Sequence, residues 1–126
     1  MLRFRQLSEV YSIVRLSPGE AVPALLTGGE FTSISRTSEE LSIVCSNKNL
    51  PAGVDPGPPW ICFKLEGPFP FSQTGVLLSV IDPLSKNGIP IFAVSTYDTD
   101  YVLIPQEYAD RAIHRLREAG HELLAG

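Results

Sequence analysis

The fold is decided by the stretch STYDTDYVLIP, which runs from Ser95 to Pro105. Residues 101–104 of this stretch are β-branched and apolar, as expected of a strand. A second apolar run precedes them at residues 89–96. The residues between the two runs, 97–100, include two aspartates, which favour turns because their side chains bond to their own backbone. The stretch therefore predicts a β-hairpin.

Helical spacing flanks this hairpin on both sides. Upstream, from about Ser72, apolar residues recur on one helical face: Val76, Leu77, Val80, Ile81 and Leu84. Pro83 marks the last turns of this helix and Gly88 its stop. Downstream, a helix beginning at Pro105 carries an apolar face of Ala109, Ala112, Ile113 and Leu116 and ends at Gly120. With strands at 60–65 and 121–124, the second half has the ferredoxin-like order β-α-β-β-α-β.

The first half of the chain follows a similar order with weaker signals. Strands are expected at residues 2–7 and 10–16, and a hairpin from 31–36 and 41–45. Ser17–Glu20 resembles a capped helix start, and residues 28–29 would end that helix. A helical turn is expected at 47–50. A shift of 60 residues superposes the two hairpins and places Ser35 on Ser95, which indicates an internal repeat.

One segment interrupts the chain between these halves. Residues 51–59 read PAGVDPGPP, with four prolines and two glycines, a composition that neither a helix nor a central strand accepts. We therefore expect a degenerate N-terminal unit at 1–59, with the joint at 51–59, and a C-terminal domain at 60–126. The predicted fold class is α+β, with two ferredoxin-like units built on antiparallel sheets.

The composition of the 126 residues is that of a folded globular protein, with 44% hydrophobic and 19% charged residues. A net charge of −4 and the absence of a basic block argue against a nucleic-acid partner or a membrane surface. No apolar run suggests a membrane span or a signal peptide, so we expect a cytoplasmic protein. Cys45 and Cys62 lie in apolar runs and are expected to be buried free thiols.

The stretch from Ser95 to Pro105 resembles a motif of the ACT domains in CASTOR-type arginine sensors and related small bacterial proteins. The helical segment 74–89 is similar to that family's pattern as well, with Thr74-Gly75 at its start and Gly88-Ile89 at its end. In the first half, residues 30–37 and 41–44 carry a similar pattern. The resemblance covers the chain from about residue 10 to residue 120.

The resemblance implies a regulatory protein rather than an enzyme. ACT domains are β-α-β-β-α-β modules that bind amino acids where two of them meet side by side. The ligand lies near the loop after the first strand, the start of the first helix and the adjoining second strand. CASTOR proteins carry four such domains on one chain. This chain would supply two, so a homodimer could rebuild a comparable assembly and signal to an unknown regulated protein.

The segment at the start of the helix expected from about Ser72 supplies one half of the expected ligand site: Phe71, Ser72, Gln73, Thr74 and Gly75. Free N–H groups at a helix start attract an anion such as an amino-acid carboxylate. The side chains add hydroxyl and amide groups, and Gly75 allows close approach to the backbone. The alternative is that Ser72 is only an N-cap and Gly75 only a packing glycine.

The hairpin supplies the other half of the expected site: Val94, Ser95, Thr96 and Asp100. Carbonyl groups of this strand and the Asp100 carboxylate would hold the ligand's ammonium group. The alternative, that Asp100 is only a turn residue, stays open, and Asp98 is expected to be a turn residue. Because Ser72 and Gln73 are neutral where the arginine-binding CASTOR loop is acidic, a neutral amino acid, or weak binding, is at least as well supported as arginine.

Signatures of catalysis and of metal binding are missing from the sequence. It contains no G-x-S-x-G, H-E-x-x-H or P-loop motif. His114 and His121 lack the spacing and the companions of a metal site, so we expect no metal, cofactor or catalytic residue. The leading function is amino-acid sensing, and the alternative is a structural interaction module whose ligand site has decayed. An unrecognised enzyme is the third hypothesis, and the lack of a nucleophile or acid–base pair argues against it.

Overall fold

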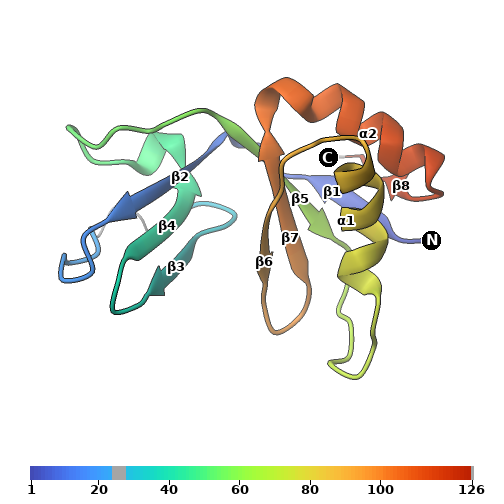
Figure 1. Cartoon of the computed structure of the whole chain (residues 1–126), viewed down its shortest axis with the longest axis horizontal. Coiled ribbons are helices and arrows are strands. Elements are labelled where there is room, and N and C mark those ends of the chain that lie inside the picture. The colour runs from blue at the N-terminus through green and yellow to red at the C-terminus, as the bar shows by residue number, and fades with distance from the viewer. Residues whose placement is uncertain (24–27, 126) are drawn as a thin grey trace. The chain divides into compact units, whose positions relative to one another are not determined.

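Two units divide the chain in the computed structural model, which describes residues 1–23 and 28–125 (Figure 1). The larger unit combines Met1–Ser8 with Ile61–Gly126, and the smaller one is Glu9–Trp60. The larger unit follows the predicted β-α-β-β-α-β order. Its elements are β1 (Arg3–Gln6), β5 (Trp60–Leu65), α1 (Val76–Lys86), β6 (Phe92–Ser95), β7 (Asp100–Pro105), a 3-10 turn (Gln106–Tyr108), α2 (Ala109–Glu118) and β8 (Glu122–Leu123). The predicted α+β class is confirmed.

The strands of the larger unit lie in the order β6-β7-β5-β1-β8. β1 runs antiparallel to β5, with Phe4 opposite Leu65, and parallel to β8, with Phe4 opposite Leu123. The N-terminal strand therefore lies between the first and last strands of the β-α-β-β-α-β unit. The division expected at 59/60 had assigned residues 1–8 to the other half. They join the larger unit because β1 completes its sheet.

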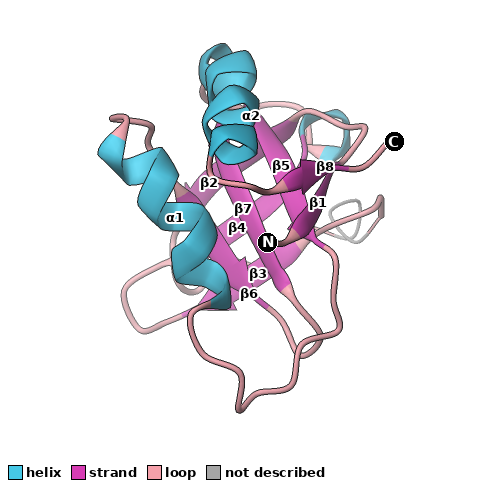
Figure 2. Ribbon diagram, turned by 90° about the vertical axis from the view of Figure 1, so that its right-hand side faces the viewer, coloured by secondary structure: helices cyan, strands magenta, loops and turns pink. Residues whose placement is uncertain are grey.

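Both helices pack on one face of this sheet (Figure 2). α1 buries Val76, Val80 and Leu84, and α2 buries Ala112 and Leu116, as their helical spacing predicts. From the sheet, alternate residues of neighbouring strands complete the same cluster: Phe4, Ile61, Phe63, Leu65, Val102 and Ile104. The helical face predicted for each segment is thus the one that forms the core.

The helix starts differ from those expected. α1 begins at Val76 rather than near Ser72, because Gln73 N–H bonds to the Pro70 carbonyl in a turn (2.9 Å) and Gly75 caps the helix with φ of 77°. Ser72 is therefore not the N-cap. α2 begins at Ala109, after the 3-10 turn that follows Pro105.

His121 connects β1 to α1. The Leu2 N–H donates to its Nδ1 at 3.1 Å, and its Nε2 lies 2.8 Å from the Ser79 carbonyl oxygen. Since Nδ1 accepts, Nε2 carries the proton and donates to Ser79. This histidine is 7% exposed and has a structural role in holding the start of the chain.

The smaller unit is an antiparallel sheet in the order β3-β4-β2. It consists of β2 (Tyr11–Leu16), β3 (Ser33–Arg36), β4 (Leu41–Ser46) and the expected helical turn (Asn47–Asn49). Residues 17–23 form turn and coil, with Glu20 N–H bonded to the Ser17 carbonyl (3.1 Å), rather than the expected helix. The rest of that expected helix, 24–27, lies outside the described residues. The segment 51–59 contains no helix or strand, as predicted.

The two hairpins are equivalent at an offset of 59 residues rather than 60. Ser33 pairs with Val44 as Phe92 pairs with Leu103 (33 to 92, 44 to 103), and Arg36 pairs with Leu41 as Ser95 pairs with Asp100. The one-residue difference matters because a slip of one position moves every side chain of a strand to the opposite face. The predicted match of Ser35 with Ser95 is therefore wrong, although both halves contain the hairpin.

We predict that Phe4→Ala destabilises the protein by about 3–5 kcal/mol. Phe4 is 1% exposed and meets Phe63 edge to face, with ring centroids 5.2 Å apart. Urea unfolding of the full chain measures the loss, and Met1→Ala is the control because Met1 is 89% exposed. Equal midpoints for the two variants would show that β1 is not part of the core.

Candidate ligand-binding site

The loop between β5 and α1 is tied to the turn between β6 and β7. Phe69 N–H donates to the Asp98 carbonyl oxygen at 2.9 Å. Gly67 also lies against this oxygen, since a Cβ at position 67 would come within 2.9 Å of it. Figure 1 shows the loop and the turn at the same end of the larger unit. Two segments that are about thirty residues apart in the sequence thus form one surface.

The β6–β7 turn is anchored to the sheet by two threonines. Thr96 N–H donates to the Thr99 carbonyl at 2.8 Å, and the Thr96 hydroxyl donates to the same oxygen at 3.0 Å. Thr99, 6% exposed, donates its own hydroxyl to the Leu65 carbonyl at the end of β5 (2.7 Å). Because these bonds define the backbone of the turn, the neighbouring side chains are held in place.

A cleft of about 230 Å³ opens between the loop and the turn. It is lined by residues of the two segments and of the start of α1: Phe69, Pro70, Phe71, Gln73, Val76, Ser95, Thr96, Tyr97, Asp98, Thr99 and Asp100. Five of the nine residues expected at the ligand site are among them: Phe71, Gln73, Ser95, Thr96 and Asp100.

The other four expected residues do not line this cleft. Ser72 and Thr74 are exposed on the loop, and Val94 is half-buried on β6, paired with Tyr101. Gly75 lines a different cavity between the two helices. Its positive φ gives it a backbone role at the helix start, because residues with a Cβ rarely adopt that conformation.

The cleft has an acidic lining. Asp98 and Asp100 are its acidic residues, and the described residues that line it include no lysine, arginine or histidine. The Ser95 hydroxyl donates to Asp100 Oδ1 at 2.5 Å, so Asp100 takes part in a contact within the cleft as well as in the hairpin pairing. Burial first, and then the charges of Cys62, Asp98 and Glu66, raise the pKa of Tyr101, which therefore stays protonated at neutral pH.

Asp98 is the acidic group that the sequence interpretation left out of the site. We expected it to be a turn residue, and it does lie in the β6–β7 turn. Its carbonyl holds the loop, however, and the residue lines the cleft. Its position next to Tyr97, in the most distinctive stretch of the sequence, was the signal that could have identified it.

The start of α1 offers backbone donors. Gly75 provides no side-chain cap, and the first turn holds no acidic residue. The first helical hydrogen bond of α1 runs from the Ser79 N–H to the Gly75 carbonyl (3.1 Å). The N–H groups of residues 76–78 therefore have no intrahelical partner, as is general for a helix start, and they carry the positive end of the helix dipole.

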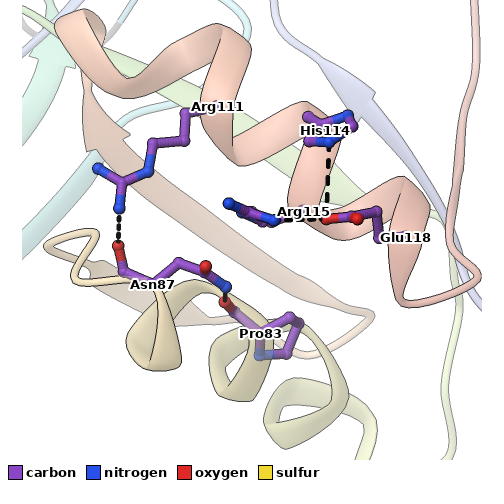
Figure 3. A network of polar contacts seen from close by, with 6 residues as sticks. All are labelled: Pro83, Asn87, Arg111, His114, Arg115 and Glu118. Atoms are coloured by element: carbon purple, nitrogen blue, oxygen red, sulfur yellow. Dashed lines mark hydrogen bonds and ion pairs between the residues drawn. The ribbon is translucent and has the colours of Figure 1, made fainter.

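A larger cavity of about 730 Å³ lies between α1 and α2. Polar contacts surround it (Figure 3): Asn87, which lines the cavity, donates its side-chain amide to the Pro83 carbonyl (2.7 Å), and Arg111 on α2, outside the lining, donates to the Asn87 carbonyl (2.5 Å). On α2, Arg115 donates to Glu118 Oε1 (2.7 Å), and His114 lies 3.6 Å from it. The hydrogen bond from Arg115 lowers the pKa of Glu118. Among the residues that line the cavity, Lys86 forms an ion pair with Asp82 (3.0 Å) and Arg115 one with Glu118, so these charges compensate one another and we do not place the ligand here.

Cys45 and Cys62 are buried thiols, as predicted, and burial raises the pKa of the Cys45 thiol. Within residues 1–23 and 28–125, no three His, Cys, Asp or Glu side chains gather into a possible metal site. None of the helices in this part of the chain has the length and apolar character needed to cross a membrane.

Comparison with known sequences and structures identifies the larger unit. The sequence model of the ACT-domain family matches residues 57–118. The chain contains an ACT domain. A separate model, for an N-terminal domain, matches residues 9–53. The ACT match spans β5 to α2, and thus includes both segments that line the cleft.

Solved structures extend this result. A protein from Agobacterium tumefaciens is 50% identical to this chain, with 98% of this chain and 92% of that chain covered and a TM-score of 0.88. The chain belongs to the same family as this protein. A Vibrio cholerae protein of unknown function, described as a possible transport protein, shares the fold at 18% identity (94% and 89% covered, TM-score 0.75). So does a structure of aspartokinase α and β subunits at 16% identity (92% and 95% covered, TM-score 0.61).

We predict that Gly67→Ala separates the loop from the turn and destabilises the ACT domain by about 1–3 kcal/mol. The added Cβ would lie 2.9 Å from the Asp98 carbonyl oxygen, a backbone atom that cannot move without breaking the Phe69 bond. Thermal unfolding measures the loss. Gly19→Ala is the matched control because no atom lies within 4 Å of its Cβ. If both variants melt as the parent does, the loop is not held in this way.

Proposed function

We propose that this chain is a non-enzymatic regulatory protein that binds a free amino acid in the cleft of its ACT domain. The observation that carries the proposal is the convergence of two distant segments. Phe71 and Gln73 from the loop meet Ser95, Thr96 and Asp100 from the hairpin around one cavity. A volume of about 230 Å³ is below the range typical of drug-sized ligands and suits a smaller molecule such as an amino acid.

The two charged groups of an amino acid would find different partners in this cleft. The carboxylate would approach the start of α1, where Val76 lines the cleft and the helix dipole favours an anion. The ammonium group would approach Asp100, whose Oδ1 already accepts from Ser95 and whose second oxygen would accept from the ligand. The acidic lining disfavours a second carboxylate on the ligand, so neutral amino acids fit better than acidic ones.

A homodimer would enclose the ligand. The cleft lies at the surface of one ACT domain, and in the resembling family the ligand lies between two such domains. The N-terminal unit would be a degenerate ACT unit, since it retains the β3–β4 hairpin at the same register as β6–β7. Ligand binding would then favour one dimer arrangement and alter the affinity for a regulated protein.

The second candidate function is a structural interaction module whose ligand site has decayed. Its support is that Ser72, Thr74, Gly75 and Val94 do not line the cleft, so only part of the expected site comes together. Calorimetric titration with the twenty amino acids distinguishes the two functions. Saturable heat with one amino acid supports the sensor, and none with any of them supports the interaction module.

We predict that Asp100→Ala weakens binding of the amino acid that binds the parent by about 1.5–3 kcal/mol. The substitution removes the charged acceptor proposed for the ligand's ammonium group. Ser95→Ala tests whether the effect comes only from the lost Ser95–Asp100 bond, and Asp110→Ala, on the exposed side of α2, controls for net charge. Calorimetry measures the affinity of each folded variant. If Asp100→Ala binds the amino acid as tightly as the parent does, the site lies elsewhere.

We predict that the protein is a dimer in solution. The expected mass is about twice 13.8 kDa, because two small units with a surface cleft gain a larger core by association. Size-exclusion chromatography with light scattering measures this mass. A monomer at high micromolar concentration would contradict both the dimer and the enclosed ligand.

A further inference from the structure

Two aromatic rings are unusually exposed at the rim of the cleft. Phe71 is 75% exposed and Tyr97 79% exposed, and they meet edge to face with ring centroids 4.8 Å apart. Large aromatic side chains are mostly covered in folded proteins, and an exposed cluster of them marks a surface that binds something. Since such a pair leaves apolar area in water, covering it with a partner would make the free energy of association more favourable.

The pair is held in place by backbone contacts. Phe71 lies in the turn closed by the Gln73–Pro70 hydrogen bond, and Tyr97 lies in the turn closed by Thr96 and Thr99. The Phe69–Asp98 hydrogen bond joins the two turns (2.9 Å). Because the backbone under the rings is already organised, binding on them loses less entropy than binding on a mobile loop.

The surface around the rings is shaped and charged. A cavity of about 290 Å³, which we name the aromatic cup, is lined by Pro68, Phe69, Pro70, Phe71, Tyr97 and Asp98. Among the described residues that line it, Asp98 is the one charged residue, and Asp100 lines the adjoining cleft. Aromatic faces attract cations, and a carboxylate beside them adds a charge-assisted hydrogen bond. The cup therefore has the composition of a receptor for a cation with a flat or extended stem.

We propose that the aromatic cup is a docking surface for a basic side chain, arginine above all, presented by a partner protein. Guanidinium stacks on aromatic rings and bonds to carboxylates better than ammonium does. Because the two rings are three-quarters exposed at the rim, a side chain carried on the surface of a partner protein can reach them. The proposal goes beyond the amino-acid cleft and does not require that the cleft bind a ligand.

Sharing of residues would connect the two sites. Phe71, Tyr97 and Asp98 line both the cup and the cleft. A ligand in the cleft that shifts either ring would change the affinity of the cup for its partner, and the partner would change the affinity of the ligand by the same factor. This gives the sensor a direct route from ligand binding to a protein partner.

The test uses the full chain and two blocked peptides, acetyl-Gly-Gly-Arg-Gly-Gly-amide and its neutral citrulline counterpart. NMR titration follows the ring protons of Phe71 and Tyr97. We expect a saturable shift with the arginine peptide, weaker at high salt, and none with the citrulline peptide. Asp98→Asn should weaken binding by about threefold to tenfold, as should Phe71→Leu combined with Tyr97→Leu. Asp110→Asn, which removes the same charge elsewhere, should leave binding unchanged.

Three results would overturn the proposal: no saturable shift with the arginine peptide, equal shifts with both peptides, or equal binding by Asp98→Asn and Asp110→Asn. Free L-arginine is titrated in parallel. If it binds while the blocked peptide does not, the rings serve the amino-acid cleft alone and the docking surface is ruled out. The reverse pattern supports the docking surface and leaves the sensor hypothesis to the calorimetric titration. Melting curves confirm that the variants, all at exposed positions, stay folded.

Discussion

The larger unit depends on the insertion of β1 between β5 and β8. Without this strand, β5 and β8 would lack the partner that joins them, and the core would lose the Phe4 ring that packs on Phe63. His121 reinforces the arrangement, since one ring nitrogen accepts from Leu2 and the other donates to Ser79 on α1. Residues 1–8 are therefore part of the larger unit, and its sheet is complete only when β1 lies between β5 and β8.

The sheet in turn positions the cleft. The Thr99 hydroxyl bonds to the end of β5 and so fixes the β6–β7 turn against the sheet. That turn holds the loop through the Asp98 carbonyl. The loop then leads into α1 through Gly75, whose positive φ directs the first N–H groups of the helix. Each contact is a backbone or short side-chain hydrogen bond, so substitutions at the exposed rim should change binding with little effect on folding. Substitutions at Gly67 or Thr99 should affect both.

The two surfaces of this region differ in what they favour. The cleft offers hydroxyls, carboxylates and the start of a helix, which suit a small zwitterion. The aromatic cup offers rings, prolines and one carboxylate, which suit a cation attached to a larger molecule. The cavity between α1 and α2 is larger than either, but its ionic side chains already pair with one another. Size alone would therefore have pointed to the least suitable of the three surfaces.

The sequence by itself determined the local elements and much of the site. Apolar runs predicted β5, β6 and β7, and helical spacing predicted the buried faces of α1 and α2. The stretch from Ser95 to Pro105 pointed to the hairpin that carries half of the cleft. Only the tertiary structure decided that residues 1–8 join the larger unit, that α1 starts at Val76, that the hairpins match at an offset of 59 (33 to 92), and that Asp98 lines the cleft. The physical reason is that spacing along the chain reports which face of an element is apolar, whereas hydrogen bonds between distant segments decide which strand lies beside which and where a turn ends.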